Sequence, residues 1–345
     1  MALDYRNSDN HGDSVNRRRA LAKMAWTGAG VLYMASGGIP HSLTLFARAE
    51  TTAGTGQVEL TIPIIMKDTS SFYWRTVLEG ARKAGQDLGV KVAELGELES
   101  AAALNPAAVV IAPAQFVALG ETIDRVAQKV KVICIDSEAD SKATTSLLKT
   151  DDVQAGRLAA DALATAIKRT YADTEGDVAL ITPLRKVSSF DERVRGFKEH
   201  IAAKYGALAL VAEKLVDDQT VTAFKAMTDL INTQPELRGM FASTPLIAQE
   251  AGRALAENNL TNKTGDKINL VGFEWDENLV KFLQDGTVAA LIVQDPFRMG
   301  YDGITIAVAA SRGDPVPPNI DTGSTLITKA NMNSPRSQEL LHPKI

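Results

Sequence analysis

Residues 70–90, SSFYWRTVLEGARKAGQDLGV, decide the fold of this 345-residue chain. They follow a β-branched strand predicted over residues 60–65, and their apolar side chains recur at the spacing of a helix over residues 74–88. Three adjacent aromatic residues, Phe72, Tyr73 and Trp74, stand where strand passes into helix, in a chain that is only 6% aromatic. Strand-to-helix turns line the ligand crevice of open α/β sheets, so we expect one ring in the core and two facing a cleft.

The alternation of strand-like and helix-like runs continues along the rest of the chain. Strands are predicted at residues 90–94, 108–111, 131–135, 177–181, 209–215, 239–242, 268–273, 288–293 and 324–328, and helices at residues 119–128, 155–170, 192–204, 220–233, 248–258, 277–285 and 300–312. This α/β alternation predicts parallel sheets covered by helices on both faces, and the number of strands favours two lobes. The last residues, 331–345, show no periodicity, so we expect them to be loosely ordered.

The composition argues against several classes of function. Lys and Arg number 37 against 42 Asp and Glu, a net charge of −5 that does not suit a nucleic-acid partner. Cys134, the only cysteine, lies in the apolar run VKVICID and is expected to be a buried, inert thiol. Of the four histidines, only His200 lies inside the predicted lobes. We therefore expect no catalytic residue, no metal site and no cofactor.

The N-terminal 49 residues have the order of an export signal. Arg17, Arg18 and Arg19 precede an apolar stretch, and the small-residue pattern that follows predicts cleavage after Ala49. Residues 18–23, RRALAK, resemble a twin-arginine motif, although no Ser or Thr precedes the pair. The alternative is an uncleaved anchor, but glycines and a proline interrupt the apolar run. We expect a periplasmic protein with a small-residue linker at residues 50–57.

Polar and aromatic side chains follow most of the predicted strands. The carboxyl ends of parallel strands form the ligand-binding edge of doubly wound sheets, so these side chains are expected to converge. Carboxylates and amides exchange hydrogen bonds with hydroxyl groups, Arg donates in a fixed plane, and rings stack on C–H faces, which suits a neutral polyol. The candidate ligand-binding residues are Lys67, Ser71, Tyr73, Trp74, Asp136, Ser137, Arg193, Thr244, Glu274, Trp275 and Gln294.

Several segments together resemble a known family. The motifs YWRTVLEGARKAGQDLGV, AVVIAPAQ, VICIDSEAD, LLKTDDVQAGRLAADAL, DERVRGFKEHI, INLVGFEWDENL and VAALIVQDPFRMGYDG occur in order between residues 58 and 331. They resemble the type I periplasmic sugar-binding proteins, ribose-binding-protein-like components of sugar ABC transporters. The resemblance implies two Rossmann-like lobes with parallel sheets, joined by a three-stranded hinge that crosses near residues 150–152, 294–296 and 321–324. The N-terminal lobe would then comprise residues 58–150 and 296–322, the C-terminal lobe residues 151–295 and 323–331, and the tail residues 332–345.

The resemblance also implies roles for individual residues. Tyr73 and Trp74 stand where the family stacks rings on the sugar, and Gln294 stands at the hinge glutamine. Asp136 matches an aspartate that accepts from hydroxyls, and Arg193 an arginine that donates to sugar oxygens. We expect Asp136 and Arg193 to sit at a solvated cleft, so that folding survives their replacement. Simpler roles stay open for both, as a turn cap for Asp136 and as a surface ion pair for Arg193.

Other positions depart from the ribose-binding pattern. Glu274 stands at a binding aspartate but is one methylene longer, and Ser137 replaces an arginine. The remaining departures are Lys67, Ser71, Thr244 and Trp275. Ribose itself is therefore not the expected ligand, and an acidic sugar stays open if Lys67, Arg185 and Lys186 face inward.

The resemblance favours a monomeric binding protein that clamps a sugar or polyol and delivers it to an ABC transporter permease. The first alternative is a sensor subunit that presents a sugar or quorum signal to a membrane receptor. A remote alternative is a glycoside-processing enzyme that uses Asp136 and Glu274 as its carboxylate pair. A repressor of the same fold would need an N-terminal helix-turn-helix, where this chain has an export signal.

Overall fold

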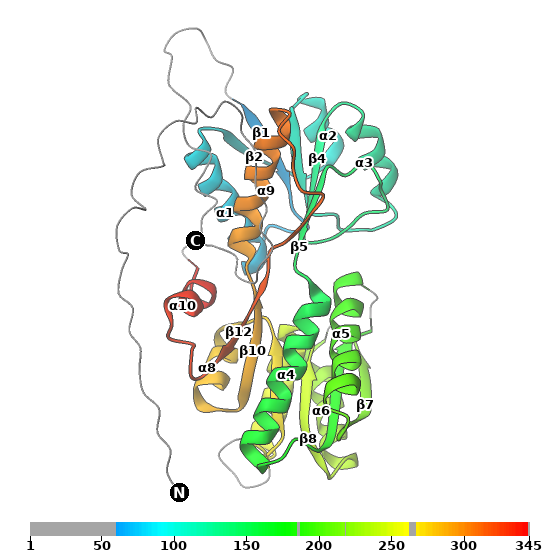
Figure 1. Ribbon diagram of the computed structural model, residues 1–345, viewed down its shortest axis with the longest axis vertical. Helices are drawn as coiled ribbons and strands as arrows, with labels where there is room; N and C mark the ends of the chain where they lie inside the picture. The colour runs from blue at the N-terminus through cyan, green and yellow to red at the C-terminus, as the bar shows by residue number, and fades with distance from the viewer. Residues whose placement is uncertain (1–59, 185–186, 218, 262–266, 344–345) are drawn as a thin grey trace, which may run out of the picture. The chain divides into compact units, whose positions relative to one another are not determined.

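The computed structural model describes residues 60–184, 187–217, 219–261 and 267–343. The predicted export signal and linker lie outside these residues. Within them the chain forms two six-stranded sheets (Figure 1). The alternating strands and helices confirm the predicted α/β class with two mainly parallel sheets.

The first sheet and its helices form what we call the N-terminal lobe. Its strands are β1 (Thr61–Ile65), β2 (Lys91–Leu95), β3 (Ala108–Ile111), β4 (Lys131–Ile135), β5 (Ser146–Lys149) and β11 (Asn319–Asp321). They are all parallel, in the order β11-β5-β4-β3-β1-β2. The helices α1 (Phe72–Leu88) and α9 (Pro296–Ser311) cover one face, and α2 (Leu98–Ala103) and α3 (Gly120–Ala127) cover the other.

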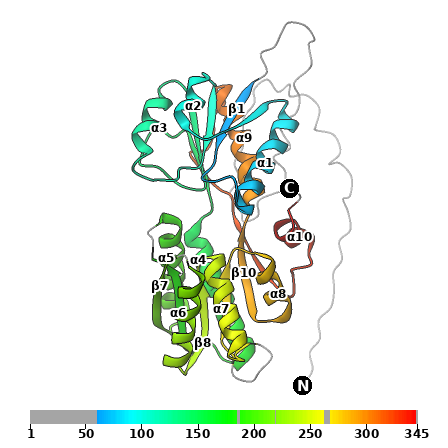
Figure 2. The ribbon, with the colours of Figure 1, turned by 180° about the vertical axis from the view of Figure 1, so that it is seen from behind.

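The second sheet forms the C-terminal lobe. Its strands are β6 (Gly176–Pro183), β7 (Leu208–Val216), β8 (Leu237–Ala242), β9 (Asn269–Phe273), β10 (Val288–Gln294) and β12 (Ser324–Thr328). Their order is β12-β10-β9-β8-β6-β7, parallel except for β12, which runs antiparallel to β10. The helices α4 (Asp152–Tyr171) and α5 (Ser188–Lys204) cover one face, and α6 (Thr220–Thr233), α7 (Pro245–Glu257) and α8 (Glu277–Asp285) cover the other (Figure 2).

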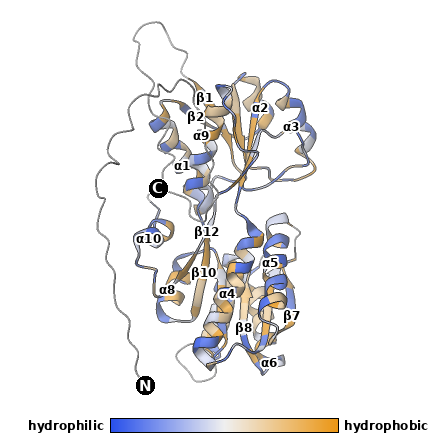
Figure 3. Ribbon diagram, viewed as in Figure 1, coloured by the Kyte–Doolittle hydropathy of each residue, from blue (hydrophilic) through white to orange (hydrophobic). Residues whose placement is uncertain are grey.

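The central strands are apolar along their whole length because both faces of each sheet are covered. In β6, Val178 and Leu180 pack under α4 and α5, whereas Ala179 and Ile181 pack under α6 and α7. Figure 3 shows the same pattern as hydrophobic strands between helices with mixed surfaces. Continuous apolar runs, rather than strict alternation, are therefore what marks these strands in the sequence.

The chain passes between the two sheets three times. The passages lie between β5 and α4, between β10 and α9, and between β11 and β12, so α9 and β11 join the N-terminal lobe late in the sequence. Two passages are bonded to each other, because the Asp151 N–H donates to Asp321 Oδ1 at 3.0 Å and the Thr150 and Thr322 hydroxyls lie 3.4 Å apart. In the described part of the chain, no helix is both long and apolar enough to cross a membrane.

The C-terminal residues differ from the sequence-based expectation. Residues predicted to be loosely ordered contain the helix α10 (Pro335–Leu341), and Met332, Leu340 and Leu341 are buried in the core of the C-terminal lobe. A helix of seven residues is too short to give a periodic signal in sequence. The short elements β5, β11 and α2 were not predicted for the same reason.

Candidate ligand-binding site

Asp136 and Glu274 occupy equivalent places in the two lobes. Asp136 directly follows β4, and Glu274 directly follows β9. Both have left-handed backbones, with φ of 64° and 65°. Each backbone N–H donates at 2.8 Å to the neighbouring strand, Asp136 to Leu148 and Glu274 to Ile292. A left-handed conformation costs roughly 1–3 kcal/mol for a residue with a side chain, and such strain gathers at functional sites.

Three polar side chains meet around the carboxylate of Asp136. Lys67 Nζ donates to Oδ2 at 2.5 Å, Ser137 Oγ donates to the same oxygen at 2.9 Å, and the Tyr73 hydroxyl donates to Oδ1 at 3.0 Å. Lys67 follows β1, Tyr73 lies in the first turn of α1, and Asp136 follows β4. The ends of two strands and the start of one helix therefore contribute to this group. Burial, with the charges of Asp136 and Glu274, raises the pKa of Tyr73 well above its usual value, which keeps the hydroxyl a donor.

Arg193 forms a buried ion pair that the sequence-based expectation missed. Its Nε and Nη2 donate to Asp152 Oδ1 at 3.1 and 2.7 Å, its Nη1 donates to the Ser243 carbonyl at 2.6 Å, and its Cζ lies 3.2 Å from the ring centre of Phe273. Arg193 and Asp152 are only 3% and 2% exposed. The expected solvated setting of Arg193 is therefore wrong. Burial raises the pKa of Asp152 to about 6, although Arg193 opposes the shift.

A close crossing of α4 and α5 brings Arg193 to Asp152. A Cβ atom on Gly156 would lie 2.1 Å from the Arg193 carbonyl oxygen, and one on Gly196 would lie 2.0 Å from the Val153 carbonyl oxygen. Only glycine fits at both contact points, so the two helix backbones touch. The pairing of Arg193 thus depends on two residues that have no polar chemistry of their own.

Glu274 is held by the residue that ends the neighbouring strand. The backbone N–H and the side-chain amide of Gln294 both donate to Glu274 Oε1, at 3.0 and 2.8 Å. Burial raises the pKa of Glu274, and the Gln294 hydrogen bonds oppose that shift. Gln294 is the last residue of β10, immediately before the passage to α9, so this pair sits where the lobes join.

The aromatic triplet divides differently from its predicted roles. Trp74 is only 6% exposed and belongs to the core of the N-terminal lobe, whereas Phe72 is 37% exposed. Phe72 meets Trp275 of the other lobe edge-on, with ring centres 5.1 Å apart. One ring is core, as expected, but it is Trp74, which the resemblance assigned to stacking. Phe72 takes the exposed place.

Two other candidates, Ser71 and Thr244, stand directly before helices. Ser71 is the N-cap of α1, and its Oγ accepts from the Trp74 N–H at 3.3 Å. Thr244 is 7% exposed and precedes α7 without a side-chain cap hydrogen bond. The neighbouring group that reaches Arg193 is the main-chain carbonyl of Ser243. The sequence gives no indication of a contact made by a main-chain carbonyl. Asp152, by contrast, could have been singled out from the sequence as the second acidic residue of the motif TDD.

Lys149 links the two lobes beside these groups. Its Nζ donates to Glu138 Oε1 at 2.8 Å in the N-terminal lobe and to Glu192 Oε2 at 2.9 Å in the C-terminal lobe. Both carboxylates raise the pKa of Lys149 against the effect of burial. The contact ties the end of β5 to the helix that carries Arg193.

The charges of the described site are balanced. Lys67, Lys149 and Arg193 each contact at least one carboxylate. A cation that is already paired offers little to an anionic ligand, so this arrangement favours an uncharged one. Arg185 and Lys186, which kept an acidic ligand open, lie outside the described residues.

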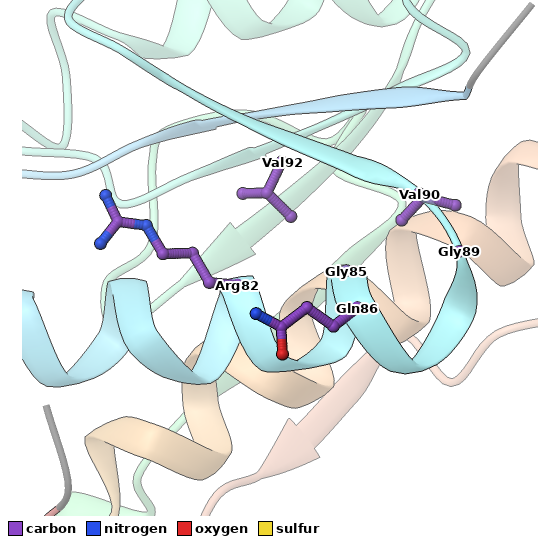
Figure 4. Close-up of a pocket in the computed structure, with 6 residues that line it drawn as sticks. All are labelled: Arg82, Gly85, Gln86, Gly89, Val90 and Val92. Carbon is purple, nitrogen blue, oxygen red and sulfur yellow. The ribbon is translucent and has the colours of Figure 1, made fainter.

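Other features do not compete with this site. Within the described ranges, no group of three or more His, Cys, Asp and Glu side chains is arranged to hold a metal ion. The Cys134 thiol is buried, as expected, and burial raises its pKa to about 11. A hollow of about 420 Å³ lies between the end of α1 and the start of β2, at the edge opposite the strand carboxyl ends (Figure 4).

Comparisons with known proteins agree with the α/β fold described above. Residues 62–315 match the periplasmic binding protein domain. The ribose import binding protein of Salmonella typhimurium is 24% identical over 298 residues, covering 82% of this chain and 95% of the relative. A carbohydrate transporter solute-binding protein from Agrobacterium radiobacter, solved with D-arabinose, is 49% identical with a TM-score of 0.74, covering 83% of this chain and 99% of that one. A solute-binding protein from Agrobacterium vitis with bound D-fucose is 28% identical with a TM-score of 0.70, covering 82% and 100%.

Proposed function

Because the chain belongs to the periplasmic binding protein family, we propose that it holds a neutral sugar between its two lobes and delivers it to an ABC transporter permease. The observation that carries the proposal is the matched pair of carboxylates, Asp136 and Glu274, each strained and each at the carboxyl end of a central strand. Hydroxyl groups of one ligand can donate to both, which couples binding to the approach of the lobes.

Each lobe supplies a set of groups suited to hydroxyls. In the N-terminal lobe these are Lys67, Tyr73 and Asp136, and in the C-terminal lobe Arg193 and Gln294 join Glu274. Arg193 has five N–H donors, of which three donate to described residues, and in this proposal the others donate to sugar oxygens. Phe72 and Trp275 offer ring surfaces to an apolar sugar face.

The ligand we propose is a neutral aldopentose, with D-arabinose as the first candidate. The solved relative that is 49% identical contains D-arabinose. The paired cations support an uncharged sugar over a sugar acid or phosphate, since each already contacts a carboxylate. The two lines of support are independent, because the first is similarity to a solved relative and the second is the pairing of cations with carboxylates in this chain.

The chain works, in this proposal, as a monomer without cofactor or catalysis. Asp136 is ion-paired with Lys67 and Glu274 accepts from Gln294, an arrangement that suits holding hydroxyl groups. A sensor subunit would use the same site and differ only in its membrane partner. A glycosidase would instead need its two carboxylates to flank a scissile bond.

A periplasmic binding protein acts outside the cytoplasmic membrane. We propose that residues 1–49 direct export and are removed after Ala49. The order of Arg17–Arg19, an apolar stretch and small residues supports this, and Arg18 with Arg19 supports the twin-arginine route.

The test uses the chain from residue 50 onward in calorimetry and thermal-shift assays. The panel contains D-arabinose, D-ribose, D-fucose, D-allose, one sugar acid and one sugar phosphate. We expect saturable binding and a raised melting temperature for a neutral sugar, because a ligand of the native state stabilises it by mass action. A nitrophenyl glycoside of the bound sugar that stays intact in the presence of the protein would argue against the enzyme alternative.

Asp136→Ala should weaken binding by roughly 1.5–3 kcal/mol, the scale of a charged hydrogen bond. Asp140→Ala is the matched control, because Asp140 is an exposed carboxylate of the same loop. Preference for the acid or the phosphate, or equal affinity in Asp136→Ala and Asp140→Ala, would contradict the proposal.

A further inference from the structure

The C-terminal segment, which we define as residues 331–343, is firmly attached to the C-terminal lobe. Met332, Leu340 and Leu341 are between 0% and 5% exposed and belong to that lobe's core. The side-chain amide of Gln338 donates to the Met332 carbonyl at 2.8 Å, which closes the segment on itself. Both ribbon views show α10 next to α8 (Figures 1 and 2).

A second anchor ties this segment to the passage between the lobes. Arg336 forms an ion pair with Asp295, whose other oxygen accepts from the Arg298 N–H and caps α9. A hollow of about 770 Å³ beside this ion pair is lined by residues of both helices, among them Phe297 and Tyr301 of α9 and Leu340 of α10.

Beyond α10, His342 reaches the aromatic contact that joins the lobes. The imidazole and Trp275 lie edge to face, with ring centres 6.2 Å apart and planes at 66°. Trp275 also meets Phe72, with ring centres 5.1 Å apart and planes at 80°. Phe72 precedes Tyr73 and Trp275 follows Glu274 directly, so this row of rings borders the candidate ligand-binding residues of both lobes.

We propose that His342 is a positioning residue for ligand binding, which holds Trp275 in the orientation that meets Phe72. The proposal rests on the proposed function for its effect on affinity. A Trp275 ring held in advance loses less side-chain freedom when a ligand is enclosed, and a held ring slows escape of the ligand. The C-terminal segment supplies the rigidity, through its buried leucines and the Arg336–Asp295 pair.

The experiment compares His342→Ala, His342→Phe and Asn333→Ala in a Trp74→Phe background. In that background, with residues 1–49 absent, Trp275 is the only tryptophan. Asn333 is the matched control, because it is an exposed residue of the same segment. Stopped-flow binding of D-arabinose gives the association and dissociation rates, and acrylamide quenching reports access to Trp275 without any ligand.

We expect His342→Ala to raise the dissociation rate about two- to tenfold, the range of one aromatic pair, with little change in association. Quenching of Trp275 should increase, and His342→Phe should restore both values because a ring edge is kept. The urea midpoint should stay constant, since His342 is exposed.

The outcomes separate this inference from the proposed function. If the parent binds sugar and His342→Ala binds it equally well, the inference is overturned and the proposed function stands. If no sugar of the panel binds the chain from residue 50 with Trp74 in place, the proposed function fails, and the quenching result still decides whether His342 positions Trp275. Unchanged quenching in His342→Ala overturns the inference in either case.

Discussion

Replacing Arg193 by alanine should destabilise the protein strongly even without ligand. The guanidinium and its partner Asp152 are 3% and 2% exposed, and three hydrogen bonds join Arg193 to Asp152 and to the Ser243 carbonyl. Removing one partner of a buried pair leaves the other charge uncompensated, which costs about 3–5 kcal/mol. Since whole domains are stable by only about 5–15 kcal/mol, the loss should be plain in urea unfolding.

The pH dependence of this loss follows from the carboxyl left behind. The pKa of Asp152 is raised from 3.8 to about 6 in the folded wild-type chain, so this group makes stability decrease as pH rises through that window. Without Arg193, folding requires a neutral Asp152, and protonation costs about 1.4 kcal/mol for each pH unit above the unfolded pKa. The deficit of Arg193→Ala should therefore be smaller near about pH 5 than near about pH 7.5.

Urea unfolding of Arg193→Ala, Asp152→Leu and the double variant Arg193→Met with Asp152→Leu tests the reasoning. The double variant should be more stable than Arg193→Ala, because neither buried charge remains. Arg195→Ala is the control, because Arg195 lies on the exposed face of the same helix, and its expected change is within about 0.5 kcal/mol. A deficit below about 1 kcal/mol for Arg193→Ala, or the same deficit at both pH values, would refute the argument.

Three further predictions concern other parts of the chain. Gly156→Ala should lower the urea midpoint and weaken sugar binding, because its Cβ would meet the Arg193 carbonyl oxygen at 2.1 Å, whereas Gly96→Ala, with nothing within 4 Å, should change neither. Burial would raise the pKa of Asp161, but its hydrogen-bond donors lower that pKa to about 2. The stability that ionised Asp161 contributes above its ordinary pKa of 3.8 should therefore be lost as the pH falls towards 2. In acid titrations, the stabilities of wild type and Asp161→Asn should converge near that pH. Replacing Arg18 and Arg19 by Lys together should trap precursor in the cytoplasm, and an unchanged periplasmic yield in cell fractionation would exclude the twin-arginine route.

The sequence predicts the central strands well because helices cover both faces of each sheet. The half-exposed edge strand β12 and the helices α6 and α8 have their predicted bounds, and so do the strands β3 and β4, which are buried apolar runs. Apolar runs of this kind need no knowledge of neighbours, since burial on both faces demands apolar side chains throughout. The same rule finds Asp136 and Glu274, which stand at the first polar positions after two such runs.

Other features depend on contacts between distant segments and escape the sequence. The burial of Arg193 follows from the glycine contacts of α4 with α5, whose partners are about 40 residues apart in the chain. Residues 331–343 are ordered because Leu340 and Leu341 pack into the core of the C-terminal lobe, which is formed by elements that precede them in the chain. Trp74 is a different case, because its helical spacing with Val77 and Leu78 already indicated burial, and only the likeness to a family suggested a stacking role.

The two lobes have separate cores, and this bears on how a ligand would act. Each of the four apolar clusters found among the described residues lies within one lobe, so apolar burial stabilises the lobes singly. Two contacts between described residues join the lobes near the site. The Lys149–Glu192 ion pair is worth about 1 kcal/mol or less, and the Phe72–Trp275 edge contact is worth up to about 1.5 kcal/mol. A neutral sugar that makes several hydrogen bonds with both lobes, at about 0.5–1.5 kcal/mol each, would outweigh those contacts. Apart from the three chain passages, the ligand would then make the strongest contact between the lobes, and the strained carboxylates Asp136 and Glu274 would be its two points of attachment.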